Sequence, residues 1–206
     1  MRICCTGGNG MVGQSIKDFI STYHHNEDDT FIFLNRSLQN EHTVDLTDRE
    51  AVLSYFEKHK FDYIIHLAAD VGGLFKNLNG NTIIFSNNIK INENVLEACV
   101  KNGIHRGIFI LSSCIFPAEP SKFPMNETMI HESAPHYSNE GYAYAKRMMH
   151  MQCQQYNKSL HTEFICLVPV NLYGPYDNFN PENSHLIPGL LHRFHNNKAT
   201  GEAMVA

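Results

Sequence analysis

Residues 2–13 have the sequence Arg2-Ile-Cys-Cys-Thr-Gly-Gly-Asn-Gly-Met-Val-Gly13, an apolar run that leads straight into a glycine cluster. The cluster fits G-x-x-G-x-x-G and also G-x-G-x-x-G. Such glycines let a turn close and let the backbone approach a pyrophosphate at the start of a helix. The sequence therefore predicts a phosphate-binding loop made of Gly7, Gly8, Asn9, Gly10, Met11, Val12 and Gly13. The alternative is a glycine turn that only packs a strand on a helix.

Short apolar runs alternate with longer amphipathic runs along the next 150 or so residues. Strands are predicted over 2–6, 30–35, 62–67, 107–112 and 163–168, with helices ending near 23 and spanning 47–60, 82–102 and 141–158. Thr47 and Glu50 have the spacing of a capping box for the second helix. Alternation of this kind indicates right-handed βαβ units. We therefore predict an α/β fold, a Rossmann-like doubly wound parallel sheet.

The end of the predicted strand 30–35 discriminates between nicotinamide cofactors. An acidic side chain there would bind the 2′-hydroxyl of NAD, whereas this chain has Asn35-Arg36-Ser37. A guanidinium pairs with the 2′-phosphate of NADP, which a carboxylate would repel. Arg36 therefore predicts NADP(H), and a solvated turn arginine is the alternative.

Tyr142 and Lys146 lie four residues apart in a predicted helix, so a phenol and an ammonium share one face. The spacing alone arises easily by chance. A nearby cation, however, lowers the pKa of a tyrosine from about 10 and makes it a better acid–base. Ser112 ends the preceding predicted strand, at the sheet edge where open parallel sheets bind ligands. It is placed to bind the same substrate oxygen.

Six segments together resemble the extended short-chain dehydrogenase/reductase family, and within it the epimerase–reductases of GDP-4-keto-6-deoxy-mannose. They are Thr6–Gly13, His66–Phe75, Ser112–Pro117, Gly141–Lys146, Asn171–Phe179 and Ser184–Arg193. The resemblance extends over the whole chain. Its Ser-Ser-Cys and Asn-Ser-His segments are much more specific than the glycine loop.

The resemblance implies a role for each reactive side chain. Tyr142 would protonate the C4 oxygen, Lys146 would hold the nicotinamide ribose and tune Tyr142, and Ser112 would support that oxygen. Cys114 and His185 would be the base and the acid of epimerisation. The chemistry fits, because protons at C3 and C5 lie α to the C4 ketone and an acid and a base can exchange them on opposite faces. A hydride from NADPH at C4 would then fix the product.

The resemblance also implies contacts with the cofactor and the sugar nucleotide. The implied cofactor residues outside the loop are Asn35, Arg36, Asp45, Leu67, Ala68, Ala69, Lys146, Pro169, Val170, Asn171, Leu172 and His185. The implied substrate residues are Asn171, His185 and Arg193, and a solvated helix arginine is the alternative for Arg193. Family chains continue beyond Ala203–Ala206, which resembles a strand before a GDP-binding segment. We therefore expect an NADP-binding domain over 1–170 and, over 171–206, the start of an incomplete substrate domain.

Composition and charge exclude several other classes of protein. Hydrophobic residues make up 43% of the 206 and charged residues 18%, as in globular proteins. The formal net charge of −5, without a basic block, argues against nucleic-acid binding. No apolar run is long enough to span a bilayer, and no apolar leader precedes the glycines.

Cysteine and histidine usage bears on the compartment and on metals. The six cysteines form no Cys-x-x-Cys pair, which predicts free thiols in a reducing cytoplasm. His185, His192 and His195 lie near one helical face. A zinc site usually has a further ligand and tighter spacing, so no metal is predicted.

A homodimer is implied by the resemblance, because the helices 82–102 and 141–158 form a two-fold four-helix interface in the family. The apolar residues Ile84, Ile91, Val95, Met148 and Met151 suit either the core or a partner, and the sequence does not decide.

Two other functions stay open: another extended short-chain nucleotide-sugar enzyme, or an NADP-binding module without activity. A dehydratase would carry Asp-Glu where this chain has Ser113-Cys114.

Overall fold

The computed structural model describes residues 1–23, 26, 28–37, 40, 42–72, 74–180 and 184–201, with the backbone only for 74–79 and 199–200. Its sheet has five parallel strands in the order β2-β1-β3-β4-β5. They are β1 (Arg2–Thr6), β2 (Thr30–Phe33), β3 (Tyr63–His66), β4 (Arg106–Ile110) and β5 (Glu163–Leu167). The helices are α1 (Met11–Tyr23), α2 (Arg49–His59), α3 (Leu74–Lys101), α4 (Glu140–Leu160) and α5 (Leu186–Thr200). This arrangement confirms the predicted Rossmann-like parallel sheet.

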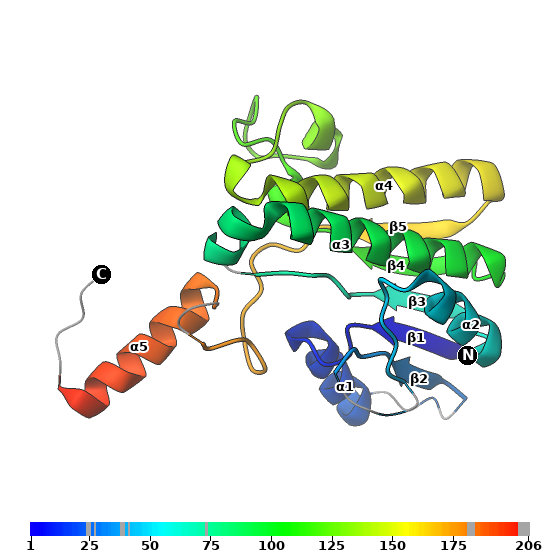
Figure 1. Cartoon of the computed structure of the whole chain (residues 1–206), viewed down its shortest axis with the longest axis horizontal. Coiled ribbons are helices and arrows are strands. Elements are labelled where there is room, and N and C mark those ends of the chain that lie inside the picture. Colours follow the sequence, from blue (N-terminus) through cyan, green and yellow to red (C-terminus); the bar gives the residue numbers. More distant parts are fainter. Residues whose placement is uncertain are drawn as a thin grey trace.

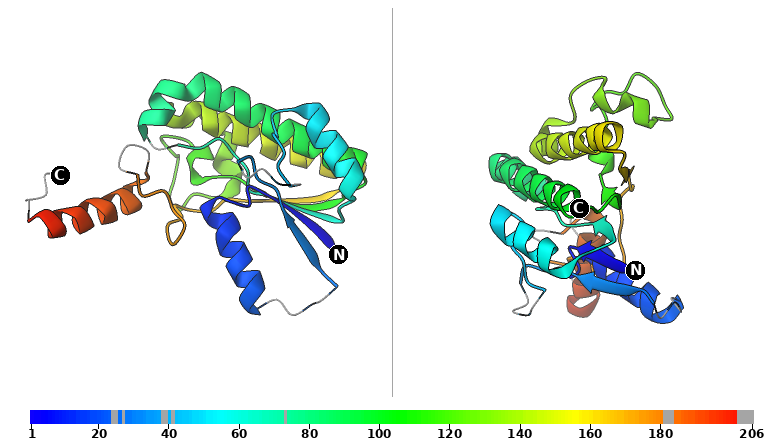
Figure 2. Two further views of the ribbon diagram at one scale, coloured as in Figure 1. Left: turned by 60° about the horizontal axis from the view of Figure 1, so that its bottom comes forward. Right: turned by 90° about the vertical axis from the view of Figure 1, so that its right-hand side faces the viewer.

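The helices cover the two faces of the sheet unequally. The helices α2, α3 and α4 lie over one face, and α1 lies on the other face near β1 and β2 (Figures 1 and 2). In β5, Phe164 is 4% exposed whereas its neighbour Ile165 is 54% exposed. Successive side chains of a strand point to opposite faces, so β5 is covered mainly on the α3–α4 side.

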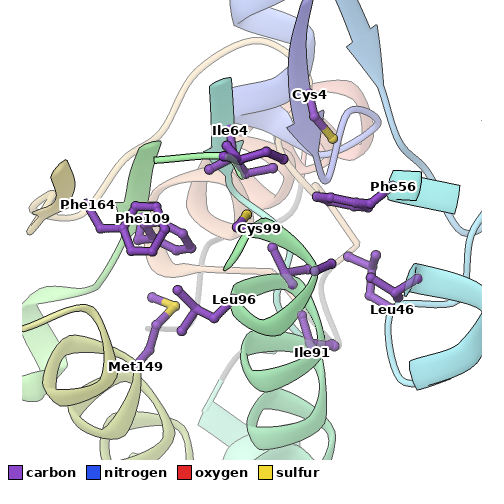
Figure 3. Close-up of a cluster of buried hydrophobic side chains, with 14 of the residues drawn as sticks. Cys4, Leu46, Phe56, Ile64, Ile91, Leu96, Cys99, Phe109, Met149 and Phe164 are labelled. Carbon is purple, nitrogen blue, oxygen red and sulfur yellow. The ribbon is translucent and has the colours of Figure 1, made fainter. Parts of the chain in front are cut away.

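The main core lies between the sheet and the layer formed by α2, α3 and α4 (Figure 3). Phe109 of β4 and Phe164 of β5 pack edge to face with ring centroids 5.1 Å apart. Leu96 of α3 and Met149 of α4 are fully buried against the same cluster. Burying a side chain of this size contributes about 1.5–3 kcal/mol, so the core holds the two long helices firmly on the sheet.

Two predicted helix starts are wrong. The helix predicted from 82 begins at Leu74 instead, so its Asn- and Gly-rich first turns are helical despite their weak helix propensity. The predicted capping box is also incorrect. Asp48 caps α2 by accepting the Ala51 N–H at 3.1 Å, while the Thr47 hydroxyl donates to Asp45 at 2.7 Å.

The segments after β4 and β5 form the carboxyl edge of the sheet. After β4 the chain makes three short 3₁₀ helices, η1 (Ser113–Ile115), η2 (Glu127–His131) and η3 (Tyr137–Asn139). After β5 it runs along the carboxyl ends of the strands, and α5 then projects away from the body (Figure 1). The predicted strand over Ala203–Ala206 lies outside the described residues.

No helix among the described residues combines the length and the apolar character that crossing a membrane requires.

Candidate active site

The glycine cluster forms a tight turn between β1 and α1. Gly7 has φ +72°, and a Cβ there would lie 2.9 Å from the Ala68 nitrogen. A Cβ on Gly13 would lie 2.5 Å from the Gly7 carbonyl oxygen, which itself accepts the Gly10 N–H at 3.0 Å. Side chains at these positions would fill the turn. The cradle at the start of α1 therefore fits a pyrophosphate group, and the contacts of residues 7–13 with such a group stay predictions.

Three predicted cofactor residues lie at and beyond the end of β2. Asn35 is buried and pairs with Thr43 in a short parallel bridge, whereas Arg36 and Asp45 are exposed. Hydrogen bonds from the backbone and hydroxyl of Thr47, together with the charge of Arg36, lower the pKa of Asp45. The guanidinium of Arg36 therefore lies beyond the end of β2, close to the ionised carboxylate of Asp45.

Residues 67–69 follow β3, and this segment begins beside the glycine turn. We call residues 67–69 the shelf. The Thr6 hydroxyl oxygen accepts the N–H groups of Leu67 at 3.2 Å and Ala68 at 3.1 Å. Because the Ala68 backbone also packs on Gly7, the last residue of β1 fixes this shelf against the phosphate loop. Leu67 and Ala68 thus lie beside the glycine turn, and the cofactor contacts of Leu67, Ala68 and Ala69 stay predictions.

The helix α4 brings Tyr142 and Lys146 to the end of β4. Lys146 is 1% exposed and its Nζ donates to the Ile110 carbonyl at 2.7 Å. The same Nζ lies 5.7 Å from the centre of the Tyr142 ring. Burial lowers the pKa of Lys146 to about 8, although three nearby cysteines oppose this shift.

The expected lowering of the Tyr142 pKa is not found. Burial, and secondarily the neighbouring Cys114, raise the pKa of Tyr142 above its usual value. The physical reason is desolvation of the phenolate in a site where Lys146 is itself buried and bonded to a backbone carbonyl. The structure therefore holds Tyr142 as a protonated phenol.

Ser112 and Cys114 lie just beyond β4, in the turn that opens η1. The Ser112 hydroxyl caps this turn by accepting the Cys114 N–H at 3.4 Å. Burial raises the pKa of the Cys114 thiol. Its hydrogen bond with Ser112 and the positive charges of Lys146 and Arg147 act in the opposite direction. The structure thus brings together four of the five predicted catalytic residues.

The predicted site residues after β5 form no hydrogen bond, ion pair or ring contact with the group formed by Ser112, Cys114, Tyr142 and Lys146 in the described part of the chain. Pro169 is partly exposed, whereas Val170, Asn171 and Leu172 are exposed along the edge of the sheet. His185, which precedes α5, and Arg193 within it are exposed too. No hydrogen bond, ion pair or ring contact among the described residues joins Asn171, His185 or Arg193 to Cys114 or Tyr142. Their roles remain predictions.

Sequence reasoning missed three residues that support the site. Gly141 precedes Tyr142, and a Cβ on it would lie 2.6 Å from the Asn81 carbonyl oxygen of α3. Arg147 is buried and donates to the Ile115 carbonyl at 2.7 Å and the Ser133 carbonyl at 2.8 Å, which ties η1 to α4. His66, the third, ends β3 with its ring fully buried. In the sequence, a polar residue inside an otherwise apolar strand was the feature that could have pointed to His66.

Metal binding has no support in the part of the chain that the structure describes. There, no three His, Cys, Asp or Glu side chains lie close enough together to hold a metal ion.

Comparison with known proteins places this site in a family. Residues 3–205 match the model of the NAD dependent epimerase/dehydratase family, and the chain belongs to that family.

Among curated relatives, the chain is 42% identical over 93% of its length to GDP-L-fucose synthase of Dictyostelium discoideum. It is 34% identical over 94% of its length to GDP-L-fucose synthase of Escherichia coli (strain K12). It spans 58% of each of these relatives. Among solved structures, a GDP-L-fucose synthetase from Naegleria fowleri bound to NADP matches with TM-score 0.87 and 36% identity, over 100% of this chain and 64% of that one. These findings confirm the resemblance seen in the sequence motifs.

Proposed function

We propose that this chain is the cofactor-binding and catalytic part of an enzyme that epimerises GDP-4-keto-6-deoxy-mannose at C3 and C5 and reduces C4, giving GDP-L-fucose. The observation that carries the proposal is the convergence of Ser112, Cys114, Tyr142 and Lys146 at the carboxyl end of β4. The glycine turn, the shelf and this group of residues follow β1, β3 and β4, which are neighbours in the parallel sheet, so all three lie at its carboxyl edge. The names of the similar proteins support the same activity.

NADP(H) is the cofactor that these residues fit. The glycine turn and the start of α1 would hold the pyrophosphate, and Arg36 would pair with the 2′-phosphate. The shelf at Leu67, Ala68 and Ala69 would support the dinucleotide along the edge of the sheet, with Asn35 and Asp45 beside the adenosine end. NADPH, when bound, supplies the hydride for C4.

The protonation state of Tyr142 suits the proposed reduction, whereas the raised pKa of Cys114 means that the thiol must lose its proton before it can act as a base. Tyr142 stays protonated because its pKa is raised, and its hydroxyl can therefore donate a proton to the C4 oxygen. Ser112 supports the same oxygen. Cys114, as a thiolate, removes a proton α to the ketone; burial raises its pKa, and the charges of Lys146 and Arg147 oppose that shift only in part. His185 returns a proton from the opposite face.

The sugar nucleotide would lie between the two proposed domains, 1–170 and 171–206. Pro169, Val170 and Leu172 would flank the nicotinamide end of the cofactor, and Asn171, His185 and Arg193 would contact the substrate. The exposure of Asn171, His185 and Arg193 beyond the sheet edge supports this role, since a ligand can reach all three.

Assembly as a homodimer in the cytoplasm is part of the proposal. The helices α3 and α4 lie side by side on the outside of the molecule (Figure 1). Ile84, Ile91 and Val95 are buried in the core, whereas Met148 and Met151 are 45% and 42% exposed. The two methionines are therefore available to a partner. All six cysteines are free thiols, as a reducing compartment requires.

The test is NADPH oxidation by the purified chain with GDP-4-keto-6-deoxy-mannose, followed by identification of the product. We expect GDP-L-fucose from the parent chain and none from Tyr142→Phe. A chain that binds NADPH but turns over no sugar nucleotide would instead be a cofactor-binding module. Turnover of a different nucleotide sugar would identify another enzyme of the family.

A further inference from the structure

A buried histidine connects the cofactor shelf to the catalytic helix. His66 is the last residue of β3, and its ring lies between β1 and α3. Its Nδ1 is 2.8 Å from the Thr6 hydroxyl oxygen, and its Nε2 is 3.2 Å from Oδ1 of Asn92 in α3. All three residues are buried, so water does not satisfy these groups. None of the catalytic steps above uses this set of contacts.

The hydrogen bonds fix where each proton lies. The Thr6 oxygen accepts the N–H groups of Leu67 and Ala68, so its own hydroxyl proton is directed to His66 Nδ1. The His66 ring then carries its proton on Nε2 and donates it to Asn92. The Asn92 amide donates in turn to the Ala145 carbonyl of α4 at 3.4 Å. Every group in this series is satisfied only when His66 is neutral and protonated on Nε2.

The electrostatics keep the histidine in that state. Burial, and after it the positive charge of Lys146, lower the pKa of His66 to about 3. The ring is therefore neutral throughout the physiological pH range, and the series of hydrogen bonds keeps one direction.

We propose that His66 is a positioning residue for NADPH binding: by accepting the Thr6 proton it orients the hydroxyl that holds the Leu67–Ala68 backbone. Through Asn92 it also ties this shelf to α4 next to Lys146. The inference rests on the proposed NADPH site. The shelf matters there because the Ala68 backbone packs directly on Gly7, so a displaced shelf would displace the phosphate loop.

Two substitutions of His66 by residues of similar size distinguish the orientation of the Thr6 hydroxyl from the packing of the side chain. His66→Asn keeps an oxygen close to the place of Nδ1 and can still accept the Thr6 proton, whereas His66→Leu cannot. We expect His66→Leu to raise the Kd for NADPH about tenfold, because an unsatisfied buried hydroxyl reorients. His66→Asn should stay within about threefold of the parent. Ile64→Val, in the same strand, is the control for a loss of packing without a change in this series.

A double-mutant cycle and hydrogen exchange complete the test. Thr6→Val removes the hydroxyl, so adding His66→Leu to it should cause no further loss of NADPH affinity. In the cofactor-free chain, exchange of the Leu67 and Ala68 amides should become faster in His66→Leu and remain slow in His66→Asn. This second readout does not need NADPH.

The outcomes distinguish this inference from the proposed function. Parent-like NADPH affinity and amide exchange in His66→Leu would overturn the inference, and so would equal losses in His66→Leu and His66→Asn or additive losses in the cycle. Failure of the parent chain to bind NADPH would contradict the proposed function and, with it, a role of His66 in NADPH binding; the exchange of Leu67 and Ala68 would then decide only whether His66 orients the Thr6 hydroxyl.

Discussion

At the scale of a single residue, we expect Arg36 to decide cofactor choice. It is exposed three residues beyond the end of β2, where the 2′ position of the adenosine ribose would lie. Arg36→Asp should raise the Kd for NADPH about 10- to 100-fold and change the Kd for NADH far less, because a carboxylate would face the 2′-phosphate. Titration with both cofactors measures this. The control is Arg106→Asp, the same charge change at the amino end of β4, and equal losses for NADPH and NADH in Arg36→Asp would contradict the assignment.

In the proposed mechanism, Cys114 is needed for epimerisation and not for reduction, so we expect its substitution to separate the two reactions. Cys114→Ser keeps the shape but replaces a thiol with a hydroxyl that barely ionises. We expect solvent deuterium exchange at C3 and C5 to slow by about 10²–10⁴-fold, the usual contribution of a general base, with NADPH affinity unchanged. Mass spectrometry of the recovered sugar nucleotide measures this exchange. Cys166→Ala is the control, and exchange at the parent rate in Cys114→Ser would refute the role of the thiol.

His66 also predicts how stability depends on pH. Its pKa is about 3 in the folded chain and near 6.5 when unfolded, so the unfolded state binds more protons between these values. The contribution of His66 is therefore fully present above pH 6.5 and is lost as the pH falls toward 3. Urea unfolding from pH 7 to pH 4 should show a shallower loss of free energy for His66→Asn than for the parent. Parallel curves would show that His66 is not buried in its neutral form.

What the sequence reveals about single residues depends on whether their role is local. The close approach of Gly7 and the four-residue spacing of Tyr142 and Lys146 are set by neighbouring backbone, so motifs predict them. The raised pKa of Tyr142 and the contacts of Arg147 depend on burial by distant segments. Residue types alone do not specify that burial, which explains why the expected pKa shift was wrong.

At the scale of elements, the docking of α3 on α4 positions Tyr142. A Cβ on Gly141 would lie 2.6 Å from the Asn81 carbonyl, a backbone atom that cannot move aside cheaply. Gly141→Ala should therefore lower the free energy of unfolding by about 1–3 kcal/mol and reduce turnover, because the start of α4 shifts with Tyr142.

A matched glycine-to-alanine substitution, for which we expect a gain in stability, tests this explanation. In Gly80→Ala the new Cβ would make an ordinary 3.6 Å contact with Ile84 inside α3. It should stabilise the chain by about 0.5–1 kcal/mol, because alanine favours a helix. Urea unfolding measures both variants. A stabilising Gly141→Ala would show that α3 and α4 are not in close contact there.

The strands and the long apolar helices could be predicted because their periodicity is local. The five strands lie within a few residues of their expected positions. The start of α3 could not be predicted, because its Asn- and Gly-rich turns have weak helix propensity and are typical of a loop. The Asp48 cap was missed because Thr47, one residue earlier, has the better sequence signature.

At the scale of the whole molecule, the sheet is covered more fully on one face than on the other. Parallel sheets in proteins are usually buried on both faces. Here Ile165 and Leu167 of β5 stay about half exposed, on the side opposite Phe164. The face of the sheet that carries Ile165 and Leu167 is therefore the less covered one, in a chain that spans 58% of its relatives' length.

We predict that the chain forms a homodimer through the outer surface of α3 and α4. Met148 and Met151 are nearly half exposed on α4, and Ile83 of α3 is more exposed still, so this layer presents apolar side chains that suit an isologous contact. Sedimentation at micromolar concentration should give twice the 23.5 kDa of one chain. A double substitution, Met148→Lys with Met151→Lys, should give the single chain, because two buried charges would face their copies across the two-fold axis. Phe19→Lys, at a more exposed residue of α1, should leave the dimer intact. A parent chain that sediments only as a single copy would show that these helices do not form the interface.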